Sequence, residues 1–218
     1  MEREKVRQLF WGGIPTVIEQ EDDSEGWERM PTKPRLEAYL YCARKTRKDP
    51  IPSGRFRALV KQSEGAASQL SSELDEQIEK DLDRTFSDAE HRDIKDYKSK
   101  LRRVLRAYAL QDPAVGYCQG LNFIAGFLLF FFEEHYVFEM MVAISAHMFS
   151  GYFVQSMVGI RVDMMACIAM LQQLQPTLHD HLQGILPAEL VVQGPLQTLF
   201  IEYLPAHTVL RHLKRPAT

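Results

Sequence analysis

The sequence has few of the features that mark secreted or nucleic-acid-binding proteins. Its 218 residues hold only three cysteines, and no two of them form a C-x-x-C pair. This pattern favours buried thiols in a reducing compartment over a disulfide framework. The formal net charge is only −3, so no global basic field indicates a nucleic-acid partner.

Long hydrophobic runs are also missing. The most apolar stretch, residues 121–132, is shorter than the roughly 20 residues that span a bilayer, and its length predicts a buried helix. The charged N-terminus, Met-Glu-Arg-Glu-Lys, has no apolar segment of a secretory signal. We therefore expect a soluble, cytoplasmic protein without a transmembrane segment, whose membrane contact is at most peripheral.

Signals for β-structure are absent as well. We find no convincing period-2 alternation, no hairpin dipeptides and no glycine-rich strand-to-helix loop. Helical periodicity recurs instead and predicts an all-α domain. The acidic stretch 19–34 is predicted to be a loop inside one domain spanning 1–218. Helices are expected over 34–45, 73–83, 92–110, 117–132, 138–153, 163–174 and 196–203.

Two short motifs carry most of the functional information: Ile78-Glu-Lys-Asp-Leu-Asp-Arg84-Thr85 and Gly116-Tyr-Cys-Gln119-Gly120. The first ends an amphipathic helix, because apolar residues recur there at every fourth position. The second presents a glutamine 35 positions after the arginine. Arginine and glutamine are the side chains that GTPases use to stabilise phosphoryl charge and to orient the attacking water.

In this order and at this separation, the two motifs resemble the paired finger motifs of the TBC family of Rab GTPase-activating proteins. The similarity is clear over residues 73–211. It implies a multi-helix TBC-type fold and a role in vesicle trafficking and intracellular protein transport, peripheral to endomembranes. Further similar segments are Trp11-Gly-Gly-Ile-Pro15, Leu101-Arg-Arg-Val-Leu-Arg-Ala-Tyr108, Leu174-Gln-Pro176 and Leu199-Phe200.

The resemblance implies that Arg84 is an arginine finger and Gln119 a glutamine finger. Both would act in trans on a Rab-family small GTPase in its GTP-bound state. GTP and Mg²⁺ would come with that partner, so no cofactor or metal of the chain's own is expected. The chain would be a GTPase activator rather than a stand-alone enzyme.

Five neighbouring residues are expected to support the two fingers. Asp81 lies three residues before Arg84, close enough to hold its guanidinium in register, and Thr85 completes the first motif. Tyr117 is predicted to brace the glutamine loop. Gly120 either allows a nucleotide to approach closely or is an ordinary turn glycine, and the same two interpretations apply to Gly116. Asn122 either bonds the loop that carries the glutamine or is a buried amide satisfied by backbone.

Other chemistry is less well supported. Cys118 as a thiol nucleophile lacks a local histidine and acid, so a small buried thiol is favoured. The His179-Asp-His181 segment lacks metal-binding companions, and surface histidines are the better interpretation. The Lys/Arg face of 95–106 most simply predicts a solvated helix side, with partner contact as the second interpretation.

The resemblance fails at both ends of the sequence. Thr16 onward does not match the Arg-Gly and Trp that normally follow the first motif, and residues 212–218 replace the family's Trp and Asp with an atypical tail. The domain therefore looks truncated, which predicts an exposed apolar face and either marginal stability or dependence on a partner. The alternative function is a catalytically impaired fragment that binds GTPases or effectors in membrane traffic.

Overall fold

The structure is a computed structural model in which all regular secondary structure of the described residues is helical, confirming the predicted all-α class. The motif at 11–15, the acidic stretch 19–34 and the tail 212–218 lie outside the described residues. Within the described part, no helix is both long and apolar enough to cross a bilayer. The described residues are 37, 40, 41, 43–45, 49–65, 68–85, 94–149, 151–154, 156–204 and 208–209.

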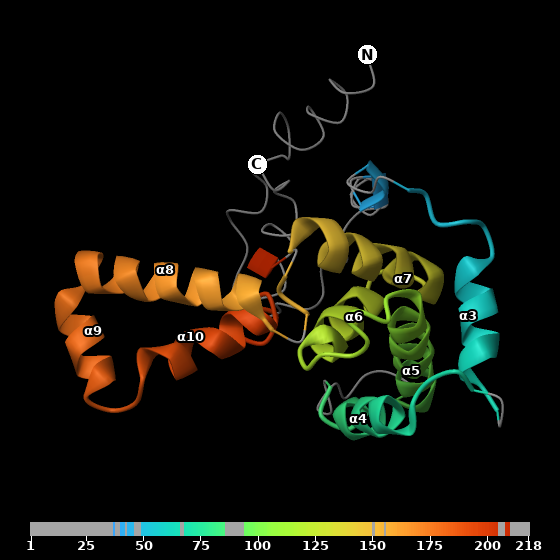
Figure 1. Cartoon of the computed structure of the whole chain (residues 1–218), viewed down its shortest axis with the longest axis horizontal. Coiled ribbons are helices and arrows are strands. Elements are labelled where there is room, and N and C mark those ends of the chain that lie inside the picture. The colour runs from blue at the N-terminus through green and yellow to red at the C-terminus, as the bar shows by residue number, and fades with distance from the viewer. Residues whose placement is uncertain are drawn as a thin grey trace, which may run out of the picture.

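The helices form a body and a protruding arm (Figure 1). In the body, α5 is central and contacts the four other α-helices. The arm packs mainly on itself, α10 against α8. The body consists of α3 (Arg55–Ser63), α4 (Ser72–Leu82), α5 (Ile94–Gln111), α6 (Leu121–Leu129) and α7 (Glu134–Ala143), which continues as the π-helix η2 (Ile144–Met148); the arm consists of α8 (Val158–Leu174), α9 (Pro176–Gln183) and α10 (Ala188–Gln197).

The predicted helices were most accurate where the apolar period was regular. The predictions for 73–83 and 92–110 correspond closely to α4 and α5. The prediction for 117–132 was wrong at its start, because residues 117–120 form a loop before α6. The prediction for 196–203 was wrong, because α10 ends at Gln197 and the chain then turns.

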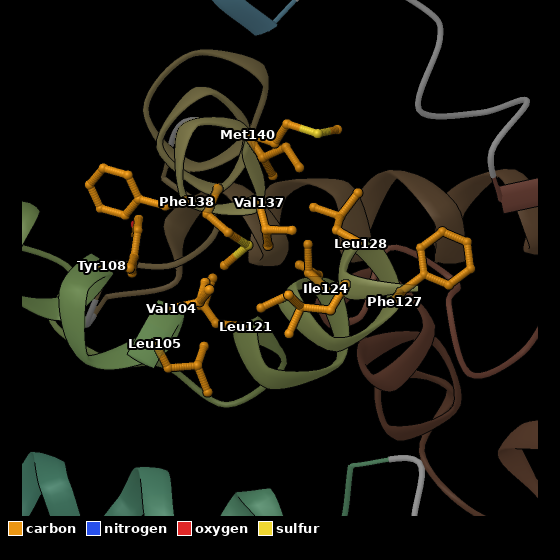
Figure 2. Packing of buried hydrophobic residues seen from close by; sticks show 14 of the residues in the cluster. Val104, Leu105, Tyr108, Leu121, Ile124, Phe127, Leu128, Val137, Phe138 and Met140 are labelled. Atoms are coloured by element: carbon orange, nitrogen blue, oxygen red, sulfur yellow. The ribbon is translucent and has the colours of Figure 1, made fainter. Parts of the chain in front are cut away.

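The core forms where α5, α6 and α7 meet (Figure 2). Leu101, Val104, Leu105 and Tyr108 follow the i, i+3, i+4, i+7 spacing of one helix face, and all four are fully buried. Nearly every residue of α6 is buried. Because a fully buried large apolar side chain contributes about 1.5–3 kcal/mol, this cluster fixes the start of α6 and the loop before it.

Helix α4 is attached to α5 by apolar and ionic contacts. Ile78 and Leu82 are buried against the core. Two bidentate ion pairs flank them: Arg102 binds Glu79 at 2.5 and 2.8 Å, and Arg106 binds Asp75 at 2.6 and 2.9 Å. The predicted solvated basic face was therefore wrong for these two arginines, since they hold the helix that ends in the first motif.

Candidate functional site

Arg84 lies in the turn that follows α4. Helix α4 begins with the Ser71 hydroxyl capping the Leu74 amide. It ends at Leu82, and the Arg84 amide then bonds the Asp81 carbonyl at 3.2 Å. The Arg84 side chain is 71% exposed, with Nη1 at 3.8 Å from Asp81 Oδ1. Arg84 is thus presented to solvent from a backbone that the helix end fixes.

Asp81 connects the two motifs through Tyr117. The Tyr117 hydroxyl donates to Asp81 Oδ2 at 2.7 Å, a much closer contact than the one that Asp81 makes with Arg84. The Tyr117 ring is buried. Burial, together with the bond to the carboxylate, raises the pKa of Tyr117 far above its ordinary value of 10. The phenol therefore stays a hydrogen-bond donor at any working pH.

Asn122 forms a second connection between the motifs. Its Nδ2 donates to Thr85 Oγ1 at 2.9 Å, and its Oδ1 accepts from the Gly120 amide at 3.1 Å. Thr85 in turn donates to the Asp81 carbonyl at 2.6 Å. Asn122 is 1% exposed. Of the two interpretations considered for it, the hydrogen bond to the glutamine loop is present. The residue after Arg84 is thereby tied to the residue after Gln119.

Both loop glycines adopt positive φ, +60° at Gly116 and +101° at Gly120. A Cβ at Gly120 would lie 2.6 Å from the carbonyl oxygen of Gln197, whereas one at Gly116 would meet a Leu74 methyl at 3.4 Å. The need for glycine at 120 therefore comes from the close approach of α10, in addition to the turn itself.

Gln119 is exposed at the tip of this loop. Its carbonyl accepts a bond from Gln197 Nε2 at 2.8 Å, and Cys118 Sγ lies 3.5 Å from the same oxygen. Burial raises the pKa of the Cys118 thiol, partly offset by its contact with Gln197. A raised pKa disfavours the thiolate that nucleophilic chemistry requires.

Gln197 was missed by the sequence reasoning. It comes from a helix 78 positions further along the chain, and nothing in Val191-Val-Gln-Gly-Pro-Leu-Gln197 marks it as a partner of the loop. Only the packing of α10 against the body brings it there.

The site thus offers two exposed polar side chains on buried, hydrogen-bonded supports. A guanidinium carries a permanent planar charge that suits phosphate oxygens, and a carboxamide can donate and accept hydrogen bonds at once. Within the described part of the chain, no cluster of three or more metal-ligating side chains occurs. The arrangement suits the stabilisation and orientation of groups that another molecule brings.

Comparison with known families identifies the class. The sequence model of the Rab-GTPase-TBC domain family matches residues 35–213. Because this match covers most of the sequence, the chain belongs to the Rab-GTPase-TBC domain family.

Individual relatives agree with this assignment. The chain is 34% identical over 128 residues to GTPase-activating protein MSB4 of Saccharomyces cerevisiae (56% of this chain), and 32% identical over 153 residues to GTPase-activating protein GYP3 of the same yeast (64%). It is 32% identical over 145 residues to growth hormone-regulated TBC protein 6 of Caenorhabditis elegans (66%). The matched regions span only 25%, 24% and 44% of these relatives.

Solved structures share the fold. A flagellar RabGAP TBC domain from Chlamydomonas superposes with a TM-score of 0.70 at 22% identity, covering 98% of this chain and 71% of that one. The Ypt/Rab-GAP domain of GYP1P gives 0.63 at 19% identity, with coverages of 97% and 72%.

Proposed function

We propose that the chain stimulates GTP hydrolysis by a Rab-family small GTPase in its GTP-bound state. Arg84 enters the partner's nucleotide site and spreads positive charge over the transferring phosphoryl group. Gln119 orients the attacking water. GTP and Mg²⁺ belong to the partner, and the reaction takes place at the cytoplasmic side of endomembranes.

The observation that carries this proposal is the bond from Asn122 to both motifs. The atoms joined, Thr85 Oγ1 and the Gly120 amide, belong to the residues directly after Arg84 and Gln119. A buried amide therefore ties together the two backbone segments that carry the exposed side chains. Two groups that must meet one phosphate and one water need such a common support, because misplacement by about 1 Å can cost 10²-fold in rate.

The expected magnitude suits a mechanism without covalent chemistry. In the Ras example, an arginine supplied in trans is worth about 10³–10⁵ in rate. This corresponds to roughly 4–7 kcal/mol of barrier at about 1.36 kcal/mol per tenfold. Charge stabilisation and positioning are sufficient sources for it.

Single-turnover hydrolysis across a panel of GTP-loaded Rab proteins tests the proposal. We expect R84A and Q119A each to lower the stimulated rate by about 10² or more. Arg84→Lys keeps the charge but loses the planar fork, so it stays impaired. Thermal melts should remain near wild type, because both side chains are exposed.

Lys80→Ala is the matched control, since Lys80 is a 69% exposed cation in the last turn of α4, just before Arg84. This variant should stimulate hydrolysis normally. Full activity of both R84A and Q119A would overturn the two-finger mechanism. A wild-type chain that binds GTP-loaded Rab proteins without accelerating hydrolysis would instead be a binding module.

A further inference from the structure

We propose that Gln197 is a positioning residue that holds in place the backbone carrying the glutamine finger. This inference rests on the function proposed for Gln119. It concerns the peptide unit between Gln119 and Gly120, whose oxygen accepts from Gln197 Nε2 at 2.8 Å. The N–H of the same peptide unit donates to Asn122 Oδ1 at 3.1 Å.

Two side-chain amides therefore hold opposite edges of one peptide plane. The plane is bonded to the Gln119 Cα, which carries the side chain. Holding both edges of the plane therefore fixes ψ at Gln119 and φ at Gly120 and limits the positions that this Cα and its side chain can take. Gly120 gives the plane unusual freedom, because glycine populates both signs of φ. The bond from Asn122 restrains the N–H, and the bond from Gln197 restrains the oxygen.

Gln197 is itself firmly held. Its side chain is 8% exposed, so an unpaired amide there would be costly. Its backbone carbonyl is so close to Gly120 that even a Cβ would not fit. The donor thus approaches the loop from a neighbouring backbone that has little room to move.

The chain just beyond Gln197 fixes the end of α10. Leu199 and Phe200 have positive φ, at +50° and +63°, which is strained for residues with a Cβ. The Phe200 amide bonds the Pro195 carbonyl at 2.7 Å, and the Thr198 hydroxyl bonds the Gly194 carbonyl at 3.1 Å. These bonds stop the helix where Gln197 meets the loop.

Gln197→Met tests the inference, because it keeps the length of the side chain and removes the donor. We expect kcat for Rab-bound GTP to fall about three- to tenfold, the worth of one neutral hydrogen bond. KM for the GTPase should stay within about twofold, since Gln197 is buried behind the exposed loop. Gln193→Met, one turn earlier on α10, is the matched control and should keep full kcat.

A double-mutant cycle separates positioning from general loosening of the fold. In the Gln119→Ala background, Gln197→Met should have no further effect on kcat. If Gln197→Met does not fold, Gln197→Leu replaces it, because its apolar side chain also lacks a hydrogen-bond donor.

Wild-type kcat in the Gln197 variants would overturn the inference. It would also be overturned if Gln197→Met lowered kcat in the Gln119→Ala background by as much as it does in the wild-type chain. Both results leave the proposed function intact. If Gln119→Ala alone keeps full stimulation, the glutamine finger and this inference fail together.

Discussion

Gly120 combines two demands that no other residue type can meet. Its φ of +101° lies in a region that side chains rarely adopt, and a Cβ would collide with the Gln197 carbonyl at 2.6 Å. Gly54 shares only the first demand: its φ is +80°, and a Cβ there would meet nothing within 4 Å. Comparing alanine substitutions at Gly54 and Gly120 therefore distinguishes the cost of positive φ alone from the added cost of the steric clash with α10.

Gly54→Ala should lower the free energy of unfolding by about 1 kcal/mol, the cost of positive φ alone. Gly120→Ala should cost at least about 2 kcal/mol more, because backbone has to move away. Urea unfolding with linear extrapolation measures both. Equal losses at the two positions would show that α10 does not press on the loop in solution.

At the scale of the element, α4 depends on its ion pairs with α5. The hydrogen bond from Arg102 holds the pKa of the Glu79 carboxyl below its ordinary value of 4.5. A carboxyl with a depressed pKa in the folded state stabilises the fold above its unfolded pKa. That contribution is lost as the pH falls through the folded value.

Glu79→Gln should therefore lower the melting temperature at pH 7 and have progressively less effect below about pH 4.5. The loss at pH 7 should be about 0.5–1 kcal/mol, because Glu79 is 39% exposed and solvent screens the pair. Glu76→Gln is the control, since Glu76 is 72% exposed and lies 3.8 Å from Lys80. Melts recorded from pH 3 to 7 provide the comparison, and a pH-independent difference for Glu79→Gln would contradict the linkage.

For the whole molecule, the arm is the unusual part. Figure 1 shows α8–α10 extending away from the body, and much of their apolar surface faces solvent. Large exposed apolar patches promote association. The exposed apolar side chains of the arm include Val158, Val162, Met165, Met170, Leu174, Leu178, Ile185, Leu186, Leu190 and Val191.

Replacing Met165 and Leu190 with glutamine should reduce binding of a hydrophobic dye and concentration-dependent self-association. These side chains are 72% and 63% exposed, so the free energy of unfolding should change by less than about 0.5 kcal/mol per site. Ile160→Gln is the buried comparison: Ile160 lies on α8 like Met165 but is only 1% exposed, so this change should destabilise the fold strongly. Dye fluorescence measures the exposed apolar surface, and light scattering measures self-association. Unchanged self-association in the double variant would show that the chain does not associate through the arm.

The sequence by itself determined the elements whose signals are local. The spacing of four residues between Leu74, Ile78 and Leu82 predicts a helix, because residues spaced in this way lie on one helix face. Each of the two motifs is a continuous stretch of sequence, so Arg84 and Gln119 could be singled out as candidates without a fold. The turn at 198–204 was not predicted, since it depends on the positive φ that Leu199 and Phe200 adopt.

Only the tertiary structure decided how the two motifs are held together. The side chains of Tyr117, Asn122 and Gln197 reach partners 36, 37 and 78 positions away. Such contacts leave no periodic trace in the sequence, because they arise when buried helices bring distant polar groups together and those groups require partners. The sequence therefore pointed to Arg84 and Gln119 as candidate side chains, and the fold supplied the hydrogen bonds that hold the backbone segments carrying them.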